Sequence, residues 1–170
     1  TGFTKTLMNG VDLIVDGGYR KRDTQSGFFG AVPTISFAST YNDAALQTWS
    51  ITPRLSIKNT LLGVPSTILT GIDYYDSAFD QQRGAFKGVP PIHVYGITQQ
   101  TLGGYWQHTI GLLPTTDVSY GARVQNTRVS ARDRYDPTAP FAFDAQATPL
   151  DSSETNYALH VGLEHRFTNV

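Results

Sequence analysis

The side chains that could carry catalysis or bind a metal are few and scattered. The sequence contains no cysteine, which excludes disulfides, thiolate zinc sites and cysteine nucleophiles. Glu164 lies four residues after His160, so the two share one face of an expected strand. A zinc site needs further ligands that converge on the same point. We therefore interpret the histidines as polar residues that line a water-filled lumen, and we expect neither a metal site nor a cofactor. The four histidines are His93, His108, His160 and His165.

Motifs of common enzymes and of nucleic-acid-binding proteins are missing from the sequence. It has no glycine-rich phosphate loop, no G-x-S-x-G nucleophile elbow and no H-E-x-x-H helix. The formal net charge is −1, so no basic field favours nucleic acid. We therefore expect a protein that is not an enzyme. An enzyme carried on a β-sandwich is the remaining alternative of that kind, and we find no catalytic set for it.

Two segments have the composition of a ligand contact. The segment 73–76 reads Asp-Tyr-Tyr-Asp, which we interpret as a strand end with aromatic residues at a rim. The segment 133–154 has the composition of a long loop, and long structured loops are often functional. Its aromatic and arginine side chains could hold a flat or anionic ligand through stacking and charge. The candidate ligand-binding residues are Arg134, Tyr135, Phe141 and Phe143.

The elements that must position these residues are β-strands, because apolar residues recur at every second position. The alternation is clear over residues 11–20, 49–58, 68–75, 118–125 and 157–167. A further strand is expected over about residues 92–111, although its two faces cannot be assigned from the alternation. The sequence thus predicts an all-β protein with about six strands of 12 residues or more and no helix.

The connections between these strands alternate in length. Short turns are expected at residues 8–10, 59–65 and 112–116, and long loops at about 30–38, 77–91 and 133–154. In an antiparallel up-and-down meander every second connection lies at the same end of the sheet. One end of the sheet should therefore carry the short turns and the other end the long loops.

Alternating strands fit two kinds of protein. In a soluble sheet the apolar side chains form a core, as in a lipocalin-like barrel that binds a small apolar ligand. In a transmembrane barrel they face lipid, while the polar side chains line a wet lumen. Soluble β-proteins are far commoner, so alternation alone favours the first.

Three features favour the membrane. The strands are long, the polar face is rich in Ser, Thr, Gln, Gly and Arg, and the loops are asymmetric. Charged residues make up only 16% of the chain, against about 25% in an average soluble domain. Aromatic residues near strand ends could form girdles at the lipid headgroups: Trp49, Tyr74, Tyr75, Tyr157 and Phe167.

The motifs resemble those of TonB-dependent outer-membrane receptors over roughly residues 10–170. The stretch WSITPRLSIKN, followed by STILTGIDYYDS, resembles a pair of their barrel strands. The stretch GGYWQHTIGLLPTTDVSYGARVQNTR resembles the next hairpin, with two departures. His108 stands where the family usually has Asp, and Val124 follows an arginine where an aromatic residue is common. The terminal NYALHVGLEHRFTNV resembles the strand that leads into a further hairpin.

The resemblance implies a transporter of the bacterial outer membrane. Such receptors have a barrel of about 22 strands filled by an N-terminal plug. They import ferric siderophores or similar scarce nutrients, using energy delivered through TonB. On this reading, residues 1–170 are a fragment of the C-terminal barrel domain, without the plug, the TonB-contacting region or the remaining strands. Membrane lipid is a further expected partner. An isolated open slice should aggregate, pair its edges with copies of itself, or curl into a smaller closed sheet.

Overall fold

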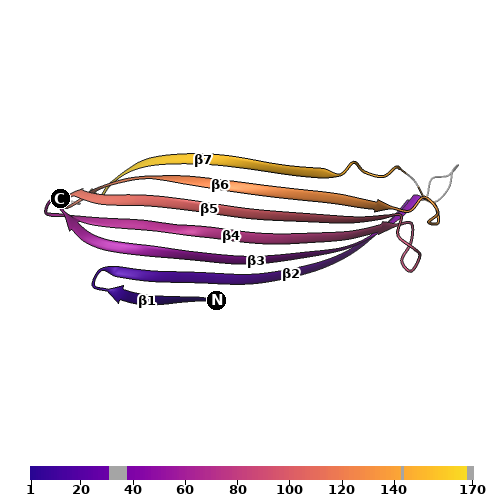
Figure 1. Cartoon of the computed structure of the whole chain (residues 1–170), viewed down its shortest axis with the longest axis horizontal. Helices are drawn as coiled ribbons and strands as arrows, with labels where there is room; N and C mark the ends of the chain where they lie inside the picture. The colour runs from indigo at the N-terminus through magenta and orange to yellow at the C-terminus, as the bar shows by residue number, and fades with distance from the viewer. Residues whose placement is uncertain (31–37, 143, 168–170) are drawn as a thin grey trace.

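The computed structural model describes residues 1–30, 38–142 and 144–167 of the chain. These residues form one antiparallel sheet of seven strands that lie side by side in chain order (Figure 1). The expected all-β meander is confirmed, and no helix capable of crossing a bilayer occurs among the described residues. The strands are β1 (Gly2–Met8), β2 (Val11–Gly30), β3 (Ala38–Leu61), β4 (Val64–Gly84), β5 (His93–Leu113), β6 (Thr116–Tyr135) and β7 (Leu150–His165).

The expected asymmetry of the connections is also confirmed. Two-residue turns join β1 to β2, β3 to β4 and β5 to β6 at one end of the sheet, called the turn end. The connections 85–92 and 136–149 lie at the other, called the loop end (Figure 1). The turn between β3 and β4 has positive φ at Leu62 (53°) and Gly63 (85°), as a type I′ hairpin requires. The expected loop at 30–38 lies mostly outside the described residues.

Two of the expected loops are too long, and one strand was missed. β4 continues to Gly84 and β7 begins at Leu150, because the polar residues there still pair with the neighbouring strands. A strand that lacks an apolar stripe gives no alternation signal, although its backbone ladder continues. β1 was missed because Lys5 interrupts the apolar side of a strand of only seven residues.

An almost unbroken register assigns every strand residue to one of two faces. The register shifts only between Thr6 and Met8 and between Gly111 and Leu113, both beside turns. Residues that pair across neighbouring strands therefore lie on the same face. This also assigns the two faces of β5, which the alternation of apolar residues could not assign. We call one side the outer face; one row of it contains Leu13, Leu55, Thr70, Trp106, Ala122 and Leu159. The inner face is the other; an adjacent row of it contains Ile14, Arg54, Gly71, Tyr105, Arg123 and Ala158.

Burial on the two faces is the reverse of that in a soluble sheet. Ile72 on the outer face is 52% exposed, whereas its neighbour Asp73 on the inner face is 8% exposed. Leu102 is 56% exposed, whereas Thr101 beside it is 7% exposed. The apolar side chains therefore do not meet in a shared dry interior. Within the described residues the sheet is also open, since β1 pairs only with β2 and β7 only with β6, so the slice does not curl closed as one expected alternative had it. The lipocalin-like alternative requires a closed barrel with an apolar inside, which this sheet lacks.

The apolar part of the outer face forms a belt of limited height. In β3 it runs from Trp49 to Ile57, and in β2 from Val11 to Tyr19, which is nine residues in each strand. A tilted strand needs about 9–11 residues to cross the hydrocarbon of a bilayer. With 20 or more residues in each of β2 to β6, these strands extend well beyond the belt, mainly toward the loop end.

Aromatic side chains mark the edge of the belt nearest the loop end. The rings of Tyr19 and Trp49 are 4.3 Å apart, and Tyr74 and Tyr157 lie near the same edge of the outer face. Trp49, Tyr74 and Tyr157 therefore lie where girdle residues were expected. Tyr75 does not, because adjacent strand residues point to opposite sides and Tyr75 falls on the inner face.

A second aromatic group lies toward the turn end of the belt and was not predicted. Tyr120 Oη is 2.9 Å from His108 Nδ1, and Ser66 Oγ is 2.7 Å from His108 Nε2. The ring of Trp106, which lies deeper in the belt in the same row as Leu55 and Leu159, packs edge-on against Tyr120 at 5.5 Å. These hydrogen bonds satisfy polar groups that face outward beside the belt. The imidazole of His108 is thus a structural member of this edge. Phe167, the remaining expected girdle residue, contacts His165 near the turn end, 4.6 Å between ring centroids.

We predict that a charge is tolerated on one side of β7 and not on the other. Leu159→Lys places an ammonium in the middle of the belt, which should cost about 2–4 kcal/mol of unfolding free energy in lipid vesicles. Asn156→Lys, on the inner face of the same strand, should change that free energy by less than about 1 kcal/mol. Denaturant titration of the full-length gene product in vesicles measures both, and equal costs would contradict the assignment of faces.

Candidate functional site

The loop end contains the dry core that the sheet lacks. Three apolar side chains among the described residues are buried, and all belong to the loops after β4 and β6: Ala85, Ile92 and Ala139. Backbone hydrogen bonds join these loops, from Ile92 N to Arg83 O and from Asp136 N to Ile92 O, each 2.8 Å. The described residues of the two loops are therefore a packed unit, which we call the loop cluster (residues 85–92, 136–142 and 144–149).

A buried aspartate fastens the loop cluster to β6. Asp133 Oδ2 lies 2.9 Å from His93 Nδ1 and accepts a hydrogen bond of 2.8 Å from the backbone N–H of Ala147. The side chain of Gln146 donates to the Asp133 carbonyl at 2.9 Å. Both the His93 and Asp133 side chains are buried. Losing such a partner leaves a buried polar group unsatisfied, so Asp133 should hold the returning half of the loop firmly.

Aromatic residues cover the surface of the loop cluster. The Tyr135 ring packs on His93 at 5.0 Å, and its hydroxyl donates to the Asp144 carbonyl at 3.2 Å. The Phe141 ring meets Phe86 edge-on at 5.6 Å and remains 71% exposed. Large exposed aromatic rings on a rigid support are suited to stacking against a flat ligand.

Cationic groups lie close to these rings. Arg83 Nη1 forms an ion pair with Asp144 at 3.4 Å, and Lys87 Nζ donates to Gln25 at 3.5 Å. Beside Lys87, a cavity of about 540 Å³ lies between the loop after β4 and the outer faces of β2 to β4 at their loop ends, so Lys87 lies on the outer side of the sheet. Aromatic and cationic side chains together could attract an anionic chelate.

The structure separates the candidate residues that the sequence grouped together. Tyr135 and Phe141 lie in or against the loop cluster. Arg134 is adjacent to Tyr135 in β6 and therefore lies on the outer face, where it is exposed. Phe143 lies outside the described residues. Phe86 and His93 were missed, because a loop phenylalanine and a histidine at a strand start carry no signal of their own.

The segment Asp73–Asp76 is likewise divided between the two faces. Asp73 lies on the inner face and pairs with Arg123 at 2.6 Å. Tyr74 lies on the outer face and donates to Asp76 at 3.1 Å. A second inner-face ion pair joins Arg54 to Asp16 at 2.8 Å. The segment is therefore part of the wall on both sides and forms no single cluster.

Asp136 begins the loop after β6 with a tight turn. The hydroxyl and the backbone N–H of Thr138 both donate to the Asp136 carboxylate, at 2.7 and 2.8 Å. These bonds, the hydroxyl first, lower the pKa of Asp136 from its usual value of 3.8. Because the folded pKa is lowered, the turn gains stability above the unfolded pKa and loses it as the pH falls through the folded pKa.

No metal centre is visible in the described part of the chain, since no three His, Asp or Glu side chains come together there. The four histidines lie apart. His93, the first residue of β5, packs against the loop cluster, and His160 lies on the inner face. His108 and His165 lie on the outer face near the turn end, so the expectation that they line a lumen is wrong for these two.

Taken together, the open antiparallel sheet, its exposed apolar belt and its polar inner face are those of a section of β-barrel wall. Solved structures of two other proteins contain a sheet of the same kind. The sheet matches the crystal structure of the unliganded ferric citrate transporter FecA with a TM-score of 0.80 and 11% identity, over 99% of this chain and 24% of FecA. It matches the ferric-catecholate import receptor Fiu from E. coli K12 with a TM-score of 0.68 and 12% identity, over 98% of this chain and 30% of Fiu.

The likeness to these TonB-dependent receptors establishes the fold and nothing further, because the sequence identities are only 11% and 12%. The chain therefore spans less than a third of the length of either protein, 24% of FecA and 30% of Fiu. No protein-family model matches the sequence, and no curated protein matches it.

We predict that Asp133→Ala releases the second half of the β6–β7 loop. The change removes the acceptor of the Ala147 and His93 contacts, so cleavage of residues 144–149 by a low concentration of protease should be about tenfold faster. Asp80→Ala, which removes an exposed carboxylate from β4, is the control and should leave cleavage unchanged. Equal cleavage rates in the two variants would show that Asp133 does not fasten the loop.

Proposed function

We propose that the chain forms part of the barrel wall of a TonB-dependent transporter in the bacterial outer membrane. The observation that carries the proposal is the inverted burial of the sheet, with exposed apolar side chains outside and enclosed polar ones inside. A lipid-facing barrel requires this arrangement, and water penalises it. The match to the barrels of FecA and Fiu supports the same conclusion.

The transporter would import a ferric siderophore or a similar scarce nutrient. FecA and Fiu are described as a ferric citrate transporter and a ferric-catecholate import receptor. In such a protein a plug and a TonB-contacting segment, both outside these 170 residues, would complete the pathway. The wall described here would supply no chemistry of its own.

The loop cluster is the part of this wall best placed to meet the nutrient. It lies at the end with the long loops, which in outer-membrane barrels is the extracellular end. Tyr135 and Phe141 supply aromatic surface there, while Arg83, on the inner face of β4, supplies positive charge. Arg134, on the outer face, would lie away from a ligand that approaches the inner side.

Binding of ferric chelates to the full-length gene product tests the proposal. A panel of citrate, catecholate and hydroxamate chelates should include one that binds in the micromolar range or tighter and supports iron-limited growth. Failure of every chelate to bind, together with normal growth of a deletion strain on all of them, would contradict a role in iron uptake.

We predict that the candidate residues differ in their effect on this binding. Phe141→Ala removes an exposed ring and should weaken binding by roughly three- to thirtyfold, the range expected for one aromatic or cation–π contact. Arg134→Ala should leave the affinity unchanged, because the Arg134 side chain lies on the outer face of β6, away from a ligand that approaches the inner side. Fluorescence titration with the chelate that binds the wild type measures both affinities. A greater loss of affinity in Arg134→Ala than in Phe141→Ala would contradict the assignment of the ligand to the inner side.

A further inference from the structure

The outer face changes character just beyond the aromatic edge of the belt on β5 to β7. On β6 the apolar residues end at Val124, and arginine then recurs on the outer face at positions 128, 132 and 134. Arg132 forms an ion pair with Asp151 of β7 at 2.6 Å. Among the described residues no ion pair or hydrogen bond engages the side chains of Arg128 and Arg134, and both are exposed. Positive charge therefore exceeds negative charge on this part of the surface.

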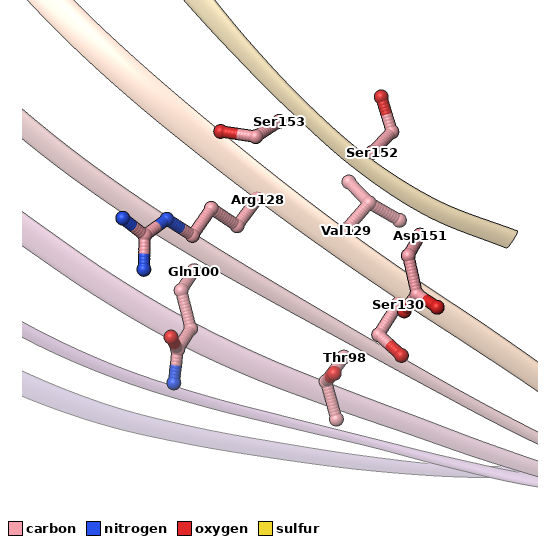
Figure 2. Close-up of a pocket in the computed structure, with 8 residues that line it drawn as sticks. All are labelled: Thr98, Gln100, Arg128, Val129, Ser130, Asp151, Ser152 and Ser153. Atoms are coloured by element: carbon pink, nitrogen blue, oxygen red, sulfur yellow. The ribbon is translucent and has the colours of Figure 1, made fainter.

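A groove runs along this surface and crosses the edge of the belt. Its larger section, about 430 Å³, lies beyond the belt and is lined mainly by polar residues. Figure 2 shows these residues on β5, β6 and β7. Gln100, Arg128 and Ser153 are register partners across β5, β6 and β7, so they form one row in it. Thr98, Ser130 and Asp151 form the next row toward the loop end.

The smaller section of the groove reaches down into the belt. It has a volume of about 180 Å³ and shares Gln100 and Arg128 with the larger section. Tyr74 and Leu102 supply its apolar wall. The groove thus has an apolar lower part and an upper part lined mainly by polar side chains, with Asp151 in the upper part and Arg128 where the two parts meet.

We propose that this groove binds one phosphorylated membrane lipid, with Arg128 as the main contact of its phosphate. A lipid beside the barrel has its acyl chains against the belt and its headgroup just beyond it, which is how the two sections are arranged. Arginine forms paired hydrogen bonds with phosphate oxygens, and the neighbouring hydroxyl and amide groups can donate further bonds. The proposal rests on the proposed function, because it requires the belt to face lipid.

Two features favour a lipid over a soluble anion or a protein partner. The groove is continuous with the apolar belt, so a soluble anion would leave its lower section empty. Asp76, which accepts hydrogen bonds from Tyr74 and Gln100, and Asp151 also lie beside the groove. These carboxylates disfavour a small free anion more than a headgroup that is held in place by its own acyl chains.

Native mass spectrometry of the full-length gene product tests this inference. The protein is released from nanodiscs of phosphatidylcholine that contain phosphatidic acid, whose phosphate is a monoester, and the retained lipids are counted. We expect Arg128→Gln to lower retention of phosphatidic acid at least tenfold, because a charge-assisted contact is lost. Arg20→Gln, which removes an exposed arginine from the inner face of β2, should leave retention unchanged.

The outcomes separate this inference from the proposed function. Equal retention by wild type and Arg128→Gln would overturn the lipid site while leaving the barrel intact. Displacement of the lipid by millimolar inorganic phosphate would mean that the groove binds free anions, which also overturns it. Failure of the wild type to enter nanodiscs would instead overturn the proposed function. Heat-modifiable migration on gels confirms that each variant is folded.

Discussion

Continuous backbone pairing is the constraint on which the rest of this structure depends. A strand in lipid has no water to satisfy its N–H and C=O groups, so each must bond to a neighbouring strand. The ladders from β2 to β7 meet this requirement almost throughout. The pairing between β3 and β4 is interrupted beside Pro53, which has no N–H, and the register shifts only beside turns. Because the register is unbroken, each residue keeps its face across the whole sheet. The apolar belt, the aromatic edge and the inner-face ion pairs all follow from it.

The same constraint explains what sequence alone could predict. Alternation at Trp49–Ile57 and Ile68–Tyr74 was clear because those strands cross the belt, where one face must be apolar. Gly103, Gly104 and His108 obscured the alternation of β5, and only pairing with β4 and β6 assigned its faces. Beyond the belt both faces are wet, so the polar ends of β4 and β7 appeared to be loops.

The candidate site was harder to predict, because its residues meet through packing between distant segments. Tyr135 and Phe141 could be selected as aromatic loop residues. The contact of His93 with Asp133 joins positions 40 residues apart and depends on the β5–β6 register. Arg134 was grouped with Tyr135 because the segment was read as loop. Once it is known to be strand, alternation places the two side chains on opposite sides.

The account depends most directly on the outer face being in contact with lipid, and both tryptophans of these 170 residues lie there. The full-length gene product in vesicles of brominated lipid, compared with its Trp49→Phe and Trp106→Phe variants, isolates the emission of each. Trp106 emission should be quenched most by bromine deep in the acyl chain, and Trp49 emission by bromine near the headgroup. Emission whose intensity is unchanged by brominated lipid but is quenched by aqueous iodide would contradict contact of the outer face with lipid.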